Sequence, residues 1–396
     1  MHDDMPLTGI RVLDLTRIIS GPFCSALLAD MGAEVIKIEA PGEGDPVRKQ
    51  GELHEGFSWY FANYNRNKLS VTLDLYSDEG KALLAALVRK SDVVVENFRP
   101  GVMEKLGLSP EALKALRPDI VHCGINGFGT SGPYRDRPAF DFIAQAMSGF
   151  MSVNGEADGP PLRAGPPVSD LVAGLHAALG IVAALLRRER SGKGESLSVS
   201  LLSSMINLLS FQASNYFASG TAPLRNGNDH ALVAPYGLFE TADGQVAIAP
   251  SNDTMYVRLL NALEMPELQA HPDFATNALR MRNRPALREV IQARTRQRQT
   301  AYWIEQCNRH GVPCGPVLSV PEVFEDPQVR DQQMAIDVEH PGHGPVRMLG
   351  FPIKFSQAPC RLRHPAPALG ADTAAVLAGI GVGAAELERL REEGIV

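Results

Sequence analysis

The sequence lacks the motifs of several common enzyme classes. The nearest approach to a dinucleotide fingerprint, Gly124-Ile125-Asn126-Gly127-Phe128-Gly129, has its glycines in the wrong order. The Walker phosphate loop, H-E-x-x-H and G-x-S-x-G are also absent, and the ten histidines form no cluster. These absences point away from hydride transfer, ATP hydrolysis, zinc chemistry and serine hydrolysis. We therefore expect no metal and no tightly bound cofactor.

Excess positive charge and paired cysteines are missing as well. The formal net charge is −7, which argues against a nucleic-acid partner. The five cysteines are scattered without C-x-x-C spacing, as is typical of reduced thiols. The chain starts with acidic residues, and its longest apolar run, near 171–186, is interrupted by two glycines and a histidine. We expect a cytoplasmic protein with no membrane segment.

What is present first is an alternation of short apolar runs with helical patterns. Such alternation predicts an α/β fold with a parallel sheet covered by helices on both faces. In this arrangement, ligands bind beyond the carboxyl ends of the strands. The predicted strands are 10–15, 34–38, 71–75, 92–96, 120–125 and 196–200, and the predicted helices include 20–31, 77–89, 170–190 and one ending near Phe217.

The composition changes near 219–223. An Asp243-Gly244 pair between apolar runs then predicts a hairpin, and 253–309 has a helical pattern. These features indicate a smaller α+β domain. The end of the chain adds a strand-like run at 351–355 and a helix from about Ala384.

Asp170 is the most informative residue. It lies where the proline-stiffened segment 165–169 turns into a long apolar helix. The helix dipole and the unpaired N–H groups there favour the ionised form of a carboxylate, which can then act as a nucleophile. The alternative is that Asp170 or Ser169 only caps the helix.

Polar loops adjoin three of the predicted strands. Residues 97–101 follow the fourth strand, 17–22 follow the first with Ser20 as a helix cap, and 65–68 precede the third. Arginine, lysine and helix N-termini at strand ends suit a phosphate or another anion, although each loop could equally carry ordinary solvated charge.

Six segments, taken in order, resemble the class III coenzyme A transferases, a family that also includes 2-methylacyl-CoA racemases. They are Gly9–Asp14, Ser20–Pro22, Gly32–Glu39, Val95–Gly101, Gly192–Gly194 and Gly311–Pro316. The resemblance implies a Rossmann-like large domain formed by residues 1–218 and 329–396. It also implies a small domain at 225–328 and an interlocked homodimer.

The resemblance further implies that Asp170 attacks an acyl-CoA thioester, giving first an aspartyl anhydride and then an aspartyl-CoA thioester. Coenzyme A is then a substrate. Family positions that contact it carry over to Ile18, Ile19, Leu73, Tyr76, Asn97, Phe98, Arg99, Lys105 and Asn126. Ala40 stands where family members often place an arginine, so Arg48 or Lys49 would have to substitute.

Two alternatives to transfer are open. Racemisation needs an acid/base group on each face of the α-carbon, and racemases have a histidine where this chain has Phe140. A CoA-binding module with a structural Asp170 is the non-catalytic alternative.

The chain looks most similar to transferases that use succinyl-CoA and a dicarboxylic acid. Candidate cations for the free carboxyl group are Arg17, Arg137 and Arg163. Residues 225–230 lack the glycine run of formyl-CoA:oxalate enzymes, which makes oxalate a less natural acceptor.

Overall fold

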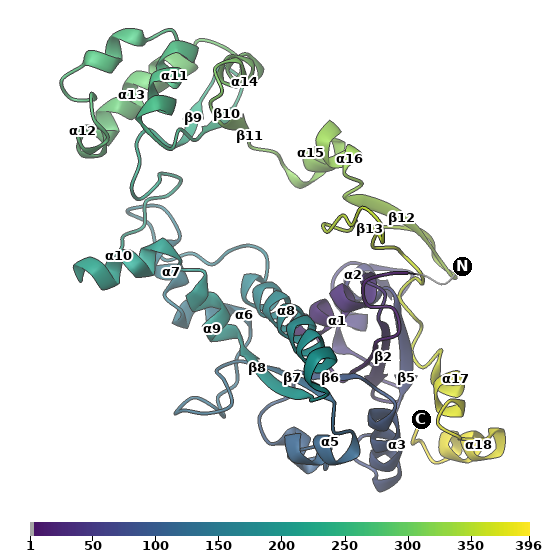
Figure 1. Cartoon of the computed structure of the whole chain (residues 1–396). Coiled ribbons are helices and arrows are strands. Elements are labelled where there is room, and N and C mark those ends of the chain that lie inside the picture. Colours follow the sequence, from purple (N-terminus) through teal and green to yellow (C-terminus); the bar gives the residue numbers. More distant parts are fainter. Residues whose placement is uncertain (1–3) are drawn as a thin grey trace. The chain divides into compact units, whose positions relative to one another are not determined.

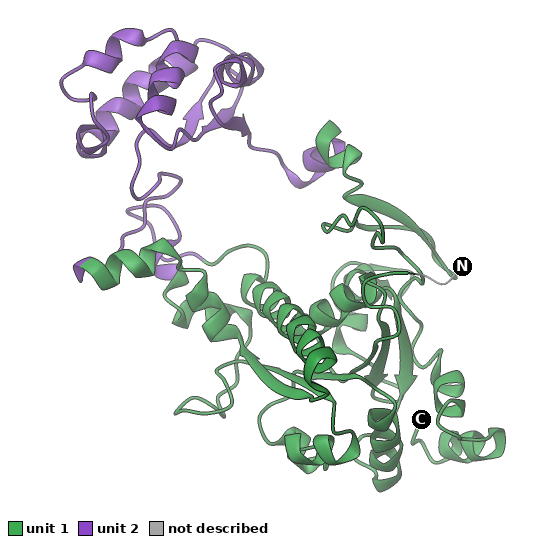
Figure 2. Cartoon of the chain, in the orientation of Figure 1, with its two compact units in different colours: residues 1–150, 163–218, 327–396 green, residues 151–162, 219–326 purple. Residues whose placement is uncertain are grey.

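A computed structural model describes residues 4–396 of the chain (Figure 1). They form two compact units (Figure 2). The first unit comprises the residues up to Phe150, Arg163–Ala218 and Pro327–Val396, so both chain ends contribute to it. The second comprises Met151–Leu162 and Ser219–Asp326. The boundaries drawn from the sequence placed 151–162 in the first segment of the large domain.

The first unit is built on a six-stranded sheet in the order β5-β2-β1-β6-β7-β8, with every neighbouring pair parallel. The strands are β1 (Arg11–Asp14), β2 (Glu34–Glu39), β5 (Lys68–Thr72), β6 (Val93–Glu96), β7 (Val121–Asn126) and β8 (Glu195–Ser200). The strands β1, β2, β6 and β7 are mostly buried and rich in apolar residues, as strands covered on both faces require, whereas the edge strand β8 is largely exposed. The strand order reverses between β1 and β6, and ligands bind at such a point.

Helices cover both faces of this sheet. One apolar core joins Val12, Val95 and Ile125 of the sheet to α1 (Ser20–Asp30), α6 (Asp141–Met147), α8 (Val168–Ser191) and α9 (Leu201–Asn207). A second core, on the opposite face, joins the sheet to α3 (Asp78–Arg89), α4 (Val102–Lys105), α5 (Pro110–Leu116) and α17 (Thr373–Ala378). The predicted α/β class with a parallel sheet is thereby confirmed.

The last part of the chain covers the β5 edge of the sheet. The carboxylate of Asp372 accepts the Ser70 N–H at 2.8 Å, and the Asp372 N–H donates to the Ser70 carbonyl at 2.9 Å. The hydroxyl of Thr373 accepts the Thr72 N–H at 3.0 Å. The backbone of this edge strand is therefore paired. The chain ends with α18 (Ala384–Glu392).

Other parts of the first unit are short. They are the 3-10 turn Pro46–Lys49, β3 (Leu53–His54), β4 (Phe57–Ser58), α2 (Trp59–Asn65), α10 (Phe211–Ser219), α16 (Pro327–Asp331) and the hairpin β12 (Ala335–His340) with β13 (Gly344–Leu349). The short helix α7 (Phe150–Val153) begins where the first unit passes into the second.

The second unit has its own core around Phe239, Leu259 and Trp303. Its three-stranded antiparallel sheet contains the hairpin predicted at Asp243-Gly244. Four helices lie between β10 and β11 in the sequence, and a fifth follows β11. The elements are β9 (Gly237–Glu240), β10 (Gln245–Ile248), α11 (Asp253–Ala262), the 3-10 turn Pro266–Ala270, α12 (Asn277–Arg282), α13 (Arg284–Thr295), α14 (Thr300–Arg309), β11 (Cys314–Pro316) and α15 (Val320–Glu325).

Three predicted elements differ from the structure. The third strand runs over Lys68–Thr72, because Lys68 is buried inside the sheet rather than being part of a polar loop. The segment 351–355 is irregular, and the hairpin β12–β13 precedes it. The helix predicted to end near Phe217 is two helices, α9 and α10, with Ser210 between them at a φ of 49°.

The helix α8 also corrects the sequence-based view of its apolar run. By length and composition alone, this helix could cross a membrane, in spite of its glycines and histidine. Within its most apolar stretch, 44% is buried in the structure. A core helix of a water-soluble protein meets the same criterion, and the buried side includes Ala173, Ala177 and Ile181.

Candidate active site

A cavity of about 340 Å³ lies at the carboxyl edge of the six-stranded sheet. Its wall is formed by the loops that follow β1, β6 and β7, together with the start of α8. This is the edge where the strand order reverses. A volume of this size is at the lower end of the range for small-molecule sites.

Asp170 reaches this cavity from the first turn of α8. Close packing of α8 on α1 positions it, because a Cβ added at Gly174 would lie 2.7 Å from the Ser20 carbonyl oxygen. Burial raises the pKa of Asp170 to about 7, and the nearby charge of Asp141 adds to this rise, whereas a hydrogen bond from Ser20 opposes it. The carboxyl group is therefore poised between its acid and base forms near neutral pH.

Neither Asp170 nor Ser169 is the N-cap of α8 in the described structure. The N-cap is Pro167, whose side chain makes no capping hydrogen bond. Ser169 instead donates both its N–H and its hydroxyl to one oxygen of Asp141, each at 2.9 Å. Gln145 donates to the other oxygen of Asp141 at 2.8 Å. Asp141 thus ties the start of α8 to α6 and leaves the Asp170 carboxylate available to the cavity.

Two tyrosines of α2 lie within the electric field of Asp170. Burial raises the pKa of Tyr60 and of Tyr64, and the negative charge of Asp170 raises both further. The rings of Tyr60 and Tyr64 pack edge to face with centroids 5.5 Å apart. Both hydroxyls therefore remain protonated near neutral pH and can only serve as neutral hydrogen-bonding groups beside the carboxylate.

The loops after β1 and β6 hold each other in place. The side-chain oxygen of Asn97 accepts the Arg17 N–H at 2.8 Å, and its amide nitrogen donates to the Arg17 carbonyl at 2.7 Å. The carboxylate of Glu96 accepts the Phe98 N–H at 2.8 Å. The Arg17 guanidinium lies 5.7 Å from the centroid of the Phe98 ring. These contacts fix one wall of the cavity before any ligand binds.

The predicted site residues are largely brought together. Nine line the main cavity, namely Arg17, Ile18, Asn97, Phe98, Arg99, Asn126, Arg137, Phe140 and Asp170. A second cavity of about 150 Å³ is lined by Leu73 and Tyr76, and Arg17 and Phe98 border both cavities. Three lie outside both: Ile19 is the buried N-cap of α1, Lys105 is exposed at the end of α4, and Arg163 is exposed before α8.

Comparison with known proteins identifies the family. The model of "CoA-transferase family III" matches residues 7–373. The chain belongs to this family.

Named relatives and a solved structure agree. The succinate–glutarate CoA-transferase of Agrobacterium fabrum is 40% identical, covering 94% of this chain and 95% of that protein. The acetyl-CoA:oxalate CoA-transferase of Acetobacter aceti is 39% identical over 89% of each chain. A crystal structure of a CAIB/BAIF family protein from Brucella suis superposes with a TM-score of 0.84 at 39% identity, covering 95% of this chain and 99% of that one.

For this CoA-transferase, two sequence-based assignments of basic residues were wrong. The segment 65–68 lies at the amino end of β5 and is buried, with Arg66 paired to Asp30 at 2.8 Å and Lys68 paired to Asp14 at 3.1 Å. The suggested substitute Arg48 is committed to Glu39 by two bonds of 2.7 Å. Arg48, Arg66 and Lys68 are therefore not free to bind a phosphate. Lys49 is exposed.

Sequence reasoning also missed residues of the transferase site. Ser20 was expected to cap α1, but Ile19 is the N-cap and Ser20 donates to Asp170. Arg135 lines the main cavity beside Arg137, whose guanidinium lies 3.9 Å from the centroid of the Tyr134 ring. In the sequence, Asp141 stood out only as the residue after Phe140, and nothing indicated its contact with the start of α8. The alternation of Arg135 and Arg137 in one polar loop was the available signal for Arg135.

Proposed function

We propose that this CoA-transferase works by covalent catalysis through Asp170. The observation that carries the proposal is the position of this carboxylate, with a pKa of about 7, on the wall of the 340 Å³ cavity. A carboxylate half-ionised near neutral pH and little hydrated is a competent nucleophile towards a thioester. Ser20, Arg17 and Arg99 border the same cavity.

The first half of the proposed reaction transfers coenzyme A onto the enzyme. A carboxylate oxygen of Asp170 attacks the thioester carbonyl carbon, the C–S bond breaks, and the CoA thiolate leaves behind an aspartyl anhydride. The thiolate then attacks the Asp170 carbonyl carbon and breaks the anhydride C–O bond. The donor acid departs as a carboxylate, and an aspartyl-CoA thioester remains.

The second half reverses these steps with a different acid. The acceptor carboxylate attacks the aspartyl thioester and expels the thiolate, giving a new anhydride. The thiolate attacks the acceptor carbonyl carbon, which releases the new acyl-CoA and restores the Asp170 carboxylate. Each addition places negative charge on an oxygen, which needs a nearby donor. The Ser20 hydroxyl borders the same cavity and is our candidate donor, once its single O–H turns from Asp170 to the oxyanion.

The two cavities suggest how coenzyme A is held. We assign its contacts to Ile18, Ile19, Leu73, Tyr76, Asn97, Phe98, Arg99, Lys105 and Asn126. The acyl end then lies in the main cavity, and the nucleotide lies towards the second cavity, beside Ala40. Arg99 and Lys105 are exposed and supply positive charge for phosphate groups.

For substrates, we propose succinyl-CoA as the donor and a dicarboxylic acid as the acceptor. A second carboxyl group requires a cation, and Arg17, Arg135 and Arg137 all border the main cavity. Arg163 lies outside that cavity, so we assign it no contact. The names of the Agrobacterium and Acetobacter relatives, which include glutarate and oxalate, support dicarboxylates as a class.

Racemisation is the less favoured alternative. Phe140 borders the main cavity and is 72% exposed, so its ring would face the substrate. A phenyl ring exchanges no proton, and racemisation needs two exchanging groups.

We also propose that residues 1–218 and 329–396 form a Rossmann-like large domain, that 225–328 form the small domain, and that two chains interlock as a cytoplasmic dimer. The strand order supports the first point. The dimer is supported by an apolar stripe on α8, where Leu175, Leu179 and Leu186 are 50%, 68% and 52% exposed. Sedimentation equilibrium tests the dimer, and a monomer would contradict it.

The test of the mechanism uses succinyl-CoA with a panel of carboxylic acids, and mass spectrometry to detect new thioesters. Hydroxylamine added during turnover converts an acyl-enzyme into a hydroxamate, which peptide mapping locates. We expect the adduct on Asp170 and no exchange by an Asp170→Asn variant. An adduct on another residue, or exchange retained by this variant, rules out the proposed role of Asp170.

A further inference from the structure

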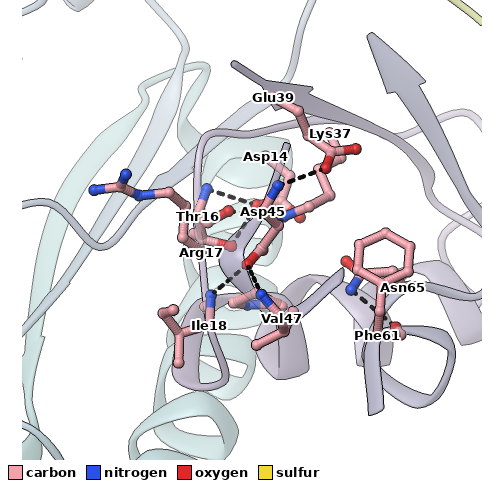
Figure 3. A network of polar contacts seen from close by, with 12 residues as sticks. Asp14, Thr16, Arg17, Ile18, Lys37, Glu39, Asp45, Val47, Phe61 and Asn65 are labelled. Carbon is pink, nitrogen blue, oxygen red and sulfur yellow. Dashed lines mark hydrogen bonds and ion pairs between the residues drawn. The ribbon is translucent and has the colours of Figure 1, made fainter. Parts of the chain in front are cut away.

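A network of buried charges lies beneath the loop between β1 and α1 (Figure 3). Lys37 comes from the middle of β2, and Asp45 comes from the loop that follows this strand. The ammonium group of Lys37 lies 2.9 Å from Oδ2 of Asp45, and both side chains are 0% exposed. Burying two charges costs free energy, which their attraction and further hydrogen bonds must offset, so the other partners of this pair are informative.

Those partners are backbone atoms of the loop. Oδ1 of Asp45 accepts the Ile18 N–H at 3.2 Å and the Val47 N–H at 3.1 Å. Lys37 donates to the Thr16 carbonyl at 2.8 Å. From β1, Asp14 accepts the Thr16 N–H at 2.9 Å. Figure 3 shows these side chains converging on the inner side of residues 16–18.

The held segment has an unfavourable backbone conformation. Ile18 has a φ of 72°, in the left-handed region that β-branched residues rarely adopt. Such a conformation persists only when its surroundings impose it, and it is concentrated at functional sites. Asn97 holds the backbone of Arg17, and Asp45 bonds the N–H of Ile18 itself. The buried pair therefore acts directly on the residue with the unfavourable conformation.

The conformation of Ile18 affects the cavity because residues before and after it in the sequence also line the cavity. Arg17 and Ile18 line the main cavity themselves. Ile19 follows as the N-cap of α1, and Ser20 then lines the same cavity as Asp170 and lowers its pKa. A change in the backbone conformation of Ile18 would therefore displace Arg17 and Ile18, which line the cavity, and the hydroxyl of Ser20 near Asp170.

We propose that Asp45, oriented by Lys37, is a positioning residue for the acyl-CoA site. It holds Ile18 in the left-handed conformation and so keeps the wall opposite Asp170 formed before the substrate binds. Being fully buried, the pair acts through the loop and never touches the substrate. The inference rests on the proposed function, because it takes the main cavity as the acyl-CoA site.

An Asp45→Asn substitution removes this support with little change in shape. Asp45 uses both oxygens, one for Lys37 and one for the Ile18 N–H, whereas an asparagine has a single acceptor oxygen. The charged Lys37 is the stronger partner for that oxygen. The amide nitrogen then faces the Ile18 N–H, and the bond to Ile18 is lost.

A double-mutant cycle with Ile18→Gly tests the link. Glycine adopts positive φ readily, so a loop with glycine at position 18 needs no support from Asp45. The readout is the dissociation constant of coenzyme A, measured by calorimetry. We expect Asp45→Asn to weaken binding about tenfold with isoleucine at position 18 and less than about twofold with glycine there. Equal weakening in both backgrounds overturns the inference.

Asp30→Asn is the matched control. Asp30 is also buried and ion-paired, with Arg66, but it lies at the far end of α1 from the cavity. We expect it to lower the melting temperature as Asp45→Asn does and to leave coenzyme A binding unchanged. If Asp30→Asn weakens binding as much as Asp45→Asn, the effect is general destabilisation and the inference is wrong.

Two further arms complete the test. If Asp45→Asn does not fold, the double variant Lys37→Met/Asp45→Leu takes its place in the cycle with Ile18→Gly. This variant replaces both charges by apolar side chains, so neither charge of the pair is left buried without its partner. The unmodified protein separates the two proposals. Failure of the wild-type chain to bind coenzyme A contradicts the proposed function itself, whereas wild-type binding with an additive cycle contradicts only the role of Asp45.

Discussion

The pKa of Asp170 makes a quantitative prediction about the pH dependence of the enzyme. In the proposed mechanism the carboxylate form of Asp170 attacks the thioester, and burial together with the charge of Asp141 raises its pKa to about 7. At pH values below this pKa the carboxyl group of Asp170 is mostly protonated and inactive. The value of kcat/KM should therefore rise as the pH rises through the pKa. With a pKa of about 7, the ionised fraction grows from roughly a tenth at pH 6 to roughly nine tenths at pH 8, so kcat/KM should rise about tenfold.

The neighbours that shift the pKa of Asp170, or whose pKa Asp170 shifts, come from three helices. Asp141 faces it from α6 and raises its pKa, and the Ser20 hydroxyl of α1 lowers it. Tyr60 and Tyr64 of α2 stay neutral over this range, because their own pKa values are raised. Asp141 is therefore the one of these neighbours whose negative charge can be removed by substitution.

An Asp141→Asn variant should shift the midpoint of the profile to lower pH, since it removes a negative charge that opposes ionisation of Asp170. Asparagine keeps one oxygen for the two donors of Ser169, so the start of α8 stays supported. The assay is initial-rate kinetics with succinyl-CoA between pH 5.5 and 8.5. Coenzyme A affinity over the same range separates ionisation of substrate phosphates from that of Asp170. A flat wild-type profile, or a midpoint that Asp141→Asn leaves in place, would refute the reasoning.

Further predictions concern packing, ion pairs and thiols. Gly174→Ala should destabilise the fold by about 1–3 kcal/mol in urea unfolding, because its Cβ would lie 2.7 Å from the Ser20 carbonyl oxygen, and an unchanged midpoint would contradict this. Arg48→Met should destabilise the fold by about 1.5–3 kcal/mol in urea unfolding, because Glu39 loses both bonds to the guanidinium and keeps only those from the Ser70 hydroxyl and the Asp45 N–H. Coenzyme A affinity should be retained, and a large loss of affinity would show that Arg48 contacts the nucleotide after all. Cys24 and Cys123 should resist thiol reagents in the native state, because burial raises the pKa of both, and rapid labelling of either would count against the described core.

The sequence was sufficient for those parts of the fold that depend on local patterns. Short apolar runs, and alternation in the case of 196–200, identified five of the six strands of the large sheet closely. The Asp243-Gly244 pair identified the hairpin of the second unit. The third strand was misplaced because Lys68 looks like a surface residue. It enters the sheet only because Asp14, 54 positions earlier, neutralises it. Pairings at this distance leave no local signal.

The candidate site follows the same division. The loops after β1, β6 and β7 could be placed at one edge of the sheet from strand order alone, and most of the predicted residues do meet there. What could not be predicted was how each side chain is engaged. Arg48 and Arg66 looked free for phosphate but are bound to buried carboxylates, whereas Ser20 looked like a cap and bonds Asp170 instead.

The pairing of the β5 edge with Asp372 and Thr373 has a consequence for synthesis of the protein. All six strands of the large sheet are translated before residue 201. The backbone N–H groups at the free edge of β5, however, stay unpaired until residues 372 and 373 have left the ribosome. An exposed edge strand is a template for association with other chains. Nascent or C-terminally truncated chains should therefore depend on chaperones, and a premature stop shortly before Asp372 should produce aggregates rather than a smaller folded enzyme.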